Sequence, residues 1–258
     1  MSEPVSYRTE GHVAWIQLQR PRSLNALDVA TDRQLLEAWR EVDRDPEVRV
    51  AVLEAAGDRA FSAGADLKDL EAREQSTIAL GGGLTGIGGP LVELRKPLIA
   101  AVQGLALGGG FELALCADVI VAASTASFGM PEAKLGLIDE AGVVHRLSRQ
   151  LPSRVASGMI LAGERLGAHA ALRFGVVNEV VEASELHAAA AIWAKRVAAV
   201  SPLVAQAAKQ AMREGEGRPL NEALSRRYDL IEQFQHSRDR QEASDAFLAD
   251  REPHWLGR

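Results

Sequence analysis

The stretch that decides the fold runs from Gly104 to Glu132 and reads GLALGGGFELALCADVIVAASTASFGMPE. Its three glycines, at 108–110, follow an apolar strand and precede an apolar helix predicted for residues 110–117. Because the first N–H groups of a helix have no acceptor within it, this junction suits negative charge that develops on an oxygen. Glu112 and Glu132 add two carboxyl groups, which can supply a base and an acid.

Strand and helix patterns continue on both sides of this stretch. Alternating residues at 5–8 and 13–19 predict a hairpin, and a helix capped by Asp28 or Thr31 is expected to reach about residue 45. Apolar or β-branched runs at 48–54, 97–103 and 119–122 predict buried strands. Strand, loop and helix repeat in this way to about residue 182, which indicates an α/β fold with a largely covered sheet.

Helical periodicity dominates the last quarter of the chain. Helices are predicted for residues 185–199, 202–212, 220–234 and 239–248, with Ser201 and Pro202 as a start signal. A helical tail of this length cannot bury all its apolar residues alone. We therefore expect it to pack over the core or on a neighbouring subunit.

The composition excludes several classes of protein. The chain has 258 residues, of which 47% are hydrophobic, and a net charge of −6. We therefore expect no nucleic acid and no non-specific polyanion as a partner, while a local basic rim could still hold a phosphorylated cofactor. The single cysteine, Cys116, excludes an internal disulfide and a cysteine metal cluster, and the six histidines lack metal-binding spacing. The first ten residues and the absence of a long apolar run predict a cytoplasmic protein without a membrane span.

Residues 81–89, GGGLTGIGG, formally match a dinucleotide fingerprint. That motif needs a strand before it and an acidic residue about twenty positions after it. Here a polar helix-like segment precedes it and Ala106 occupies the distant position, so a dinucleotide site is not expected. Residues 70–89 are interpreted as a flexible lid, with a plain surface connector as the alternative.

A second informative segment is AFSAGADLK, from Ala60 to Lys68. Small residues at 63–65 let the backbone approach a ligand closely, because little side chain stands in the way. Taken alone, the segment is equally typical of a tight turn that Asp66 caps.

Taken together, FSAGADLKDL, ALGGGFELALCAD and FGMPEAKLG closely resemble the enoyl-CoA hydratase/isomerase (crotonase) family. The resemblance extends from RPRSLNAL near the N-terminus to LAGERLGAHAALRFGVVNEVV near residue 180. It implies a crotonase-type spiral of β-β-α units over residues 1–195 and a helical oligomerisation region over 196–258. It also implies an acyl-CoA thioester substrate, a homotrimer or dimer of trimers, and no metal or redox cofactor.

The resemblance assigns roles to four residues. The backbone N–H groups of Ala65 and Gly109 would form an oxyanion hole for the thioester oxygen. Glu112 would deprotonate the attacking water, and Glu132 would protonate the α-carbon. The plainer alternative is that each glutamate is a first-turn helix acid. Isomerases of the family commonly keep only one acid, so two acids favour hydration.

Further residues are expected to contact the acyl-CoA substrate. Lys68 and Arg22 resemble basic contacts to the CoA, although either could be an ordinary solvated side chain. The neighbouring positions of the same loops complete the expected binding set, which comprises Ala63, Asp66, Leu67, Gly108, Pro131, Asp139 and Glu140.

One loop departs from the family pattern, which runs Leu-Gly, two residues, then Pro-x-x-Gly-Gly. Here Asp139 replaces the proline, Glu140 occupies a position that is often glycine, and Val143 replaces the second glycine. Facing the pocket, the two acids would raise neighbouring carboxyl pKa values and favour a polar or cationic acyl group. Facing solvent, they would do neither.

An acid at the position of Glu140 is typical of the carnitinyl-CoA dehydratase branch, which the chain also resembles in GGGFELALCADVIV and DREPHWLGR. Acids in this loop also serve diene isomerases, so isomerisation stays open. A weakly catalytic acyl-CoA-binding protein is a third hypothesis, because the loop is altered.

Overall fold

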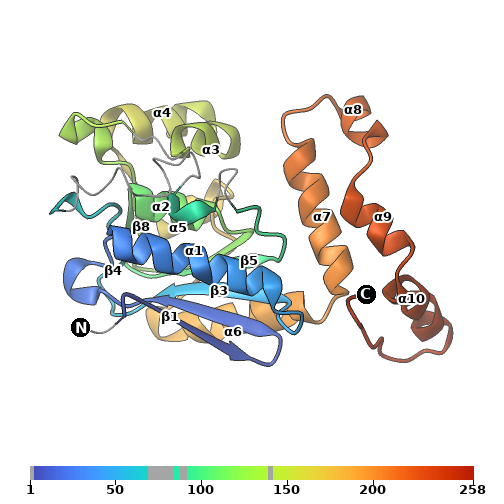
Figure 1. Cartoon of the computed structure of the whole chain (residues 1–258). Helices are drawn as coiled ribbons and strands as arrows, with labels where there is room; N and C mark the ends of the chain where they lie inside the picture. Colours follow the sequence, from blue (N-terminus) through green and yellow to red (C-terminus); the bar gives the residue numbers. More distant parts are fainter. Residues whose placement is uncertain (1–2, 69–83, 88–91, 139–141) are drawn as a thin grey trace.

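The computed structural model describes residues 3–68, 84–87, 92–138 and 142–258. Two sheets form its centre, and helices cover them (Figure 1). The larger sheet has the order β1 (Val5–Glu10), β2 (Val13–Leu18), β3 (Val50–Ala55), β5 (Leu98–Val102), β7 (Val119–Ala123) and β10 (Glu179–Val181). β1 and β2 form the predicted antiparallel hairpin, and the other neighbours are parallel.

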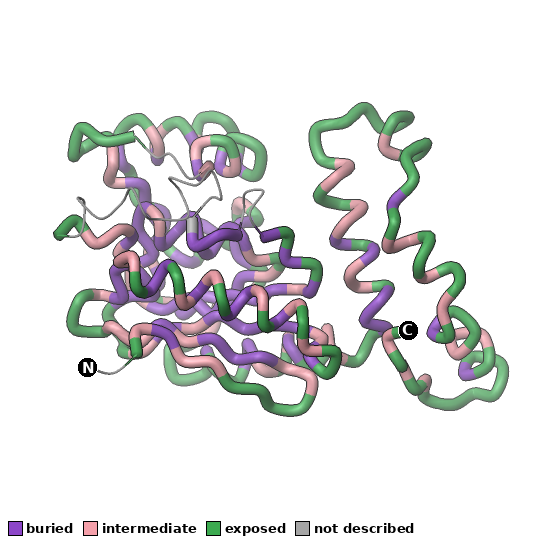
Figure 2. Tube along the Cα trace, viewed as in Figure 1, coloured by how far each residue is buried: buried purple, intermediate pink, exposed green. Residues whose placement is uncertain are grey.

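Alternate residues of the larger sheet face two separate apolar layers. Trp15, Val50 and Val52 pack on one face with α6 (Leu186–Ala198). Ile16, Leu53 and their neighbours point to the opposite face, where α1 (Val29–Arg44) contributes its apolar side. This period of two is what a sheet covered on both faces requires. Buried positions are accordingly concentrated in the strands (Figure 2).

A smaller sheet holds the glycine-rich segments. It has the order β4 (Ala60–Ser62), β6 (Leu105–Leu107), β8 (Ser127–Gly129) and β9 (Arg165–Gly167). β4, β6 and β8 are parallel, and β9 joins antiparallel. The sequence did not predict these strands individually, because three residues are too few to display a period.

Short helices connect the two sheets around the glycines. They are η1 (Pro21–Ser23), η3 (Leu84–Gly86), α2 (Gly109–Leu115), η4 (Glu132–Leu135), α3 (Val143–Gln150), α4 (Ser153–Ala162), α5 (Ala168–Arg173) and η5 (Ala183–Glu185). α1 begins as predicted, since the Asp28 side chain accepts a hydrogen bond from the Thr31 N–H at 2.8 Å. Most of residues 70–89, the expected lid, lies outside the described residues.

The tail comprises α7 (Pro202–Gly215), α8 (Leu220–Ser225), α9 (Asp229–Gln235) and α10 (Arg238–Leu248), which stand to one side of the body (Figure 1). Ser201 caps α7 as predicted. The single helix expected for 220–234 is wrong, because the chain breaks between α8 and α9. Around the break, Arg226 pairs with Glu214 of α7, and the Leu230 N–H donates to Gln210 of α7 at 3.1 Å. These contacts with α7 favour two helices, although the apolar periodicity of residues 220–234 predicted one.

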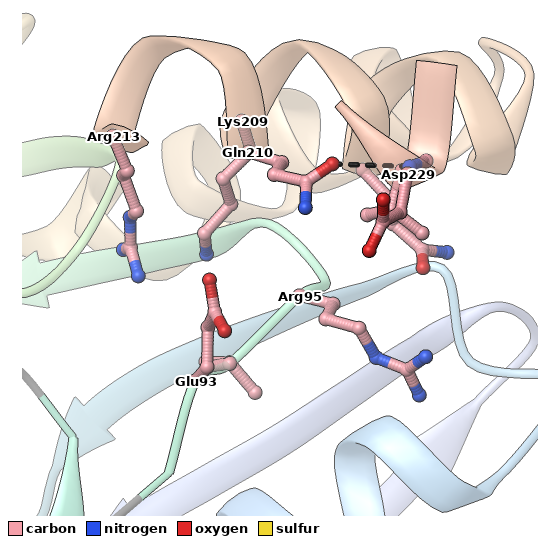
Figure 3. A pocket seen from close by; sticks show the side chains of 9 residues that line it. Glu93, Arg95, Lys209, Gln210, Arg213 and Asp229 are labelled. Carbon is pink, nitrogen blue, oxygen red and sulfur yellow. Dashed lines mark hydrogen bonds between the residues drawn. The ribbon is translucent and has the colours of Figure 1, made fainter. Parts of the chain in front are cut away.

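Three charged residues attach the tail to the core. Lys209 Nζ lies 2.6 Å from Asp118 Oδ2 and also donates to the Lys96 carbonyl at 2.7 Å. Arg213 bonds Asp118 Oδ1 at 3.3 Å and the Cys116 carbonyl at 3.2 Å. Figure 3 shows Lys209 and Arg213 extending from α7 toward the core, beside a cavity of about 280 Å³. None of the predicted catalytic residues lines this cavity.

Burial lowers the pKa of Lys209 to about 8, although Asp118 opposes the shift. The ammonium is therefore less stable in the fold than in water.

No single helix in the described ranges is long and apolar enough to cross a membrane. One pair, Ala183–Ala198 with Pro202–Gly215, passes by length and composition but is bent by 100°.

Candidate active site

The turn between β6 and α2 brings Glu132 against the glycines. Gly108 has a φ of 51° and donates its N–H to the Gly129 carbonyl at 2.9 Å, which pairs the turn with β8. A Cβ built on Gly108 would lie 2.2 Å from Glu132 Oε1. Only glycine leaves room for that carboxyl and accepts this backbone conformation.

The loop after β4 lies directly beside the start of α2. A Cβ built on Gly64, whose φ is 87°, would lie 3.0 Å from the Gly109 nitrogen and 2.8 Å from the Leu107 carbonyl oxygen. The segments at 63–65 and 107–109 are therefore in backbone contact. The sequence predicted that both would approach a ligand, and the structure brings them together.

The two backbone N–H groups predicted for an oxyanion hole lie at this junction. Within the described residues, neither Ala65 nor Gly109 donates its backbone N–H to a protein acceptor. The neighbouring N–H groups are engaged: Ala63 donates to Leu24 O at 3.0 Å, Gly64 to Ser62 Oγ at 3.2 Å, and Asp66 to Leu27 O at 2.9 Å. The N–H groups of Ala65 and Gly109, which are predicted for an oxyanion hole, are therefore available to an acceptor at this junction.

Buried polar groups hold the Ala65 loop in place. Ser62 Oγ donates to the Asn25 carbonyl at 2.8 Å, and the Asn25 amide donates to the carbonyls of Ala56 and Ala60 at 3.0 and 2.8 Å. Asn25 is 1% exposed. Its hydrogen bonds fix the positions of β4 and the loop after it, since a buried amide left unbonded would be costly.

Arg20 supports the same loop and was not singled out from the sequence. Its Nη2 lies 2.9 Å from Asp28 Oδ2 and 3.0 Å from Asp66 Oδ2, and all three side chains are at most 22% exposed. Asp66 also accepts from the Lys68 N–H at 3.2 Å, which agrees with a capped turn. The ion pair of Asp66 with Arg20 thus holds the Ala65 loop in place.

Glu112 lies in the first turn of α2 and is 1% exposed. Its neighbours Phe111 and Leu113 are fully buried, which fixes the helix against the smaller sheet. A Cβ built on Gly142, the residue before α3, would lie 3.6 Å from Glu112 Oε1. The carboxyl of Glu112 therefore lies between the starts of α2 and α3.

Glu132 is half-buried at the start of η4, directly after Pro131. The turn is closed by hydrogen bonds from the Lys134 N–H to the Pro131 carbonyl and from the Leu137 N–H to the Glu132 carbonyl, both at 2.9 Å. Lys134 Nζ donates to the Gly163 carbonyl at 2.8 Å, which ties η4 to the end of α4. This anchoring directs the Glu132 carboxyl toward Gly108.

The predicted CoA contacts divide into two groups. Lys68, Arg22 and Leu67 are exposed and available to a ligand at the surface. Ala63 and Pro131 are half-buried beside the two oxyanion loops. Asp139 and Glu140 lie outside the described residues.

Cys116 is a buried core residue. Burial raises the pKa of its thiol to about 11, so the thiol is protonated and unreactive at neutral pH. His145, on α3, is exposed. Among the described residues, no three His, Cys, Asp or Glu side chains are grouped so as to hold a metal ion.

This arrangement suits a reaction through an oxyanion. Two backbone N–H groups from adjoining loops can donate to one oxygen, where negative charge would develop. Glu132 lies against Gly108, the residue before the Gly109 donor, and Glu112 lies in the first turn of α2, the helix that begins at Gly109. Two carboxyls near one anion site can act as the base and the acid of a proton transfer.

Comparison with known proteins agrees with this geometry. The sequence pattern of the family described as enoyl-CoA hydratase/isomerase matches residues 8–258. A carnitinyl-CoA dehydratase of Salmonella typhimurium is 41% identical over 263 residues, covering 100% of both chains. A solved structure described as a short chain enoyl-CoA hydratase from Novosphingobium aromaticivorans is 47% identical, with a TM-score of 0.91 over 99% of this chain and 98% of that one.

An enoyl-CoA hydratase from Mycobacterium marinum is 33% identical, with a TM-score of 0.92 over 100% of both chains. These likenesses confirm the α/β fold that the sequence predicted. Because the family pattern and the relatives span nearly the whole chain, this protein belongs to the enoyl-CoA hydratase/isomerase (crotonase) family.

Proposed function

We propose that the protein adds water reversibly to the double bond of a 2-enoyl-CoA thioester. The observation that carries this proposal is the contact between the two loops, in which a Cβ at Gly64 would lie 3.0 Å from the Gly109 nitrogen. It supports a pair of converging donors, the N–H groups of Ala65 and Gly109, for one thioester oxygen.

The proposed reaction runs through an enolate. Glu112 takes a proton from water, and the water oxygen bonds to the β-carbon of the substrate. The electron pair of the double bond moves toward the thioester, whose oxygen becomes negative and is held by the N–H groups of Ala65 and Gly109. Glu132 then gives a proton to the α-carbon, and the thioester carbonyl is restored. Dehydration reverses these steps, and no cofactor beyond the substrate's own CoA takes part.

The test is turnover of crotonyl-CoA by the wild-type protein and by Glu112→Gln and Glu132→Gln, with product mass measured in ¹⁸O-labelled water. We expect the wild type to incorporate one solvent oxygen, and each variant to be slower by at least ~100-fold, in the range typical of lost acid or base catalysis. Binding of the CoA thioester, measured by calorimetry, should survive both substitutions.

Glu185→Gln is the matched control, because Glu185 is exposed at the start of α6 and is not part of the site. It should leave the rate unchanged. Full activity in both active-site variants would contradict the proposed roles. A shifted double bond without solvent oxygen would identify an isomerase, and binding without turnover over a broad panel would identify a binding protein.

We further propose a polar or cationic acyl group as the preferred substrate. The 41% identity to a carnitinyl-CoA dehydratase supports this, and so do the acids at 139 and 140. The same assay with crotonobetainyl-CoA and with longer enoyl-CoA thioesters tests it. A higher kcat/KM for a plain long chain than for crotonobetainyl-CoA would contradict the preference.

A trimer or dimer of trimers is proposed as the assembly, with residues 196–258 as the oligomerisation region. The support is that large apolar side chains on the tail helices are exposed in the single chain, among them Met212, Leu220, Leu224 and Phe247. Light scattering coupled to gel filtration tests the assembly, and a monomeric mass would contradict it. A cytoplasmic location stays a prediction.

A further inference from the structure

The starts of α2 and α3 lie side by side, and the two helices pack on one another. Glu112 and Gly142 mark the first contact, with 3.6 Å between Glu112 Oε1 and a Cβ built on Gly142. One turn later, the Cys116 N–H donates to the Glu112 carbonyl at 3.2 Å, and the Arg146 N–H donates to the Gly142 carbonyl at 3.0 Å. Arg146 therefore belongs to the face of α3 that meets α2.

The charges acting on Cys116 agree with this register. Burial is the largest cause of the raised pKa of the Cys116 thiol; the guanidinium of Arg146 lowers that pKa and the Glu112 carboxylate raises it. Both charges thus act on one side chain of α2. Arg146 is half-buried, and Glu112 is 1% exposed.

Other elements and charged groups of the described residues also lie near α2. β4, β6 and η3, which pack on α2, carry no ionisable side chain. Glu132, on the η4 side, is a second acid and lies against Gly108. Lys209 and Arg213 reach this region from the tail, but both are paired with Asp118. Arg146 is the cation of α3 that lies one turn after Gly142.

We propose that Arg146 is a positioning residue that keeps the buried Glu112 carboxyl ionised through its positive charge. This inference rests on the proposed function, in which Glu112 must be a carboxylate to take a proton from water. A carboxyl at 1% exposure favours the neutral form unless a nearby cation offsets the loss of hydration. The role is electrostatic and reaches the substrate only through Glu112.

The test compares Arg146→Gln with the wild type in two ways. The acidic limb of the pH profile of kcat/KM should move upward by about 1 pH unit or more in the variant, the usual size of such a charge effect. The pKa of Glu112, followed by NMR of ¹³C-labelled glutamate carboxyls and assigned with Glu112→Gln, should rise equally. Near pH 8.5 the variant should keep a kcat close to that of the wild type.

Arg149→Gln is the matched control, since Arg149 is exposed on the same helix and donates to the His145 carbonyl at 2.9 Å. It should move neither readout, and Arg146→Lys, which keeps the charge, should restore most of the wild-type limb. If the glutamine variant does not fold, Arg146→Met keeps the apolar stem and gives the same comparison.

A rise in the Glu112 pKa of less than about 0.5 unit, or an equal rise in Arg149→Gln, would overturn the inference, since a neighbouring charge should do more. The NMR titration needs no substrate. Failure of the wild type to hydrate any enoyl-CoA would therefore remove the proposed function while the effect of Arg146 on Glu112 could still be read.

Discussion

Replacing Gly64 by alanine is the sharpest perturbation of the proposed oxyanion hole. The new Cβ would lie 2.8 Å from the Leu107 oxygen and 3.0 Å from the Gly109 nitrogen, while ordinary contacts begin at 3.4 Å. Both neighbours are backbone atoms and cannot rotate away. The two loops must therefore separate by about half an ångström, because packed interiors have no spare volume.

Two costs follow from this substitution. Alanine at a φ of 87° costs ~1–2 kcal/mol of folding free energy. Separation of the loops lengthens one of the two hydrogen bonds to the thioester oxygen, and loss of one such donor costs ~3–4 kcal/mol in the transition state. We expect kcat to fall by ~100-fold or more, with a smaller change in KM.

The assay is steady-state hydration of crotonyl-CoA together with urea unfolding of the same samples. Gly175→Ala is the matched control, because Gly175 has a φ of 77° and nothing lies within 4 Å of its added Cβ. The control should lose a similar ~1–2 kcal/mol of stability and keep its kcat. A kcat for Gly64→Ala within about threefold of the wild type would refute the reasoning, because a lost donor should cost far more.

Three further predictions follow from charged residues. Between pH 8 and 10.5, Lys209 binds up to one more proton in the unfolded chain than in the folded protein. The stability of the wild type, relative to that of Lys209→Met, should therefore rise by up to ~1.4 kcal/mol per pH unit. Urea unfolding from pH 7.5 to 9.5 measures this, and a constant difference would contradict it. Lys68→Ala should raise KM for crotonyl-CoA several-fold at unchanged kcat, and should have no effect on a pantetheine thioester that lacks the nucleotide; an equal effect on both would rule out a nucleotide contact. Arg20→Met should cost ~3 kcal/mol of stability, because it leaves the carboxylates of Asp28 and Asp66 unbalanced; urea unfolding that shows less than ~1 kcal/mol would mean that the cluster is solvated.

The sequence predicted the elements that show a long enough pattern. The runs at 48–54 and 119–122 became β3 and β7, and the apolar segment after the three glycines became α2. The smaller sheet could not be predicted strand by strand. β4 and β6 have three residues each, and their pairing depends on segments more than forty residues apart in the chain.

The residues of the candidate site also divide into those that a continuous motif predicts and those that depend on contacts between distant segments. Ala65, Gly109 and the two glutamates could be named from their motifs, because each motif is continuous in sequence. Arg20 was missed, since its partner Asp66 is 46 residues away and each side chain alone resembles an ordinary surface charge. Only the packed structure joins them.

The unused N–H groups of Ala65 and Gly109 belong to the main chain, which has a consequence for how this protein can change. No exchange of one ordinary side chain for another at Ala65 or Gly109 deletes its backbone donor, so the proposed anion-binding pair is lost only where a substitution moves the loops, as at Gly64. The carboxyl groups of Glu112 and Glu132, by contrast, belong to side chains, and a single substitution removes either one. Mutation can therefore change the proposed acid and base while the proposed backbone donors are retained.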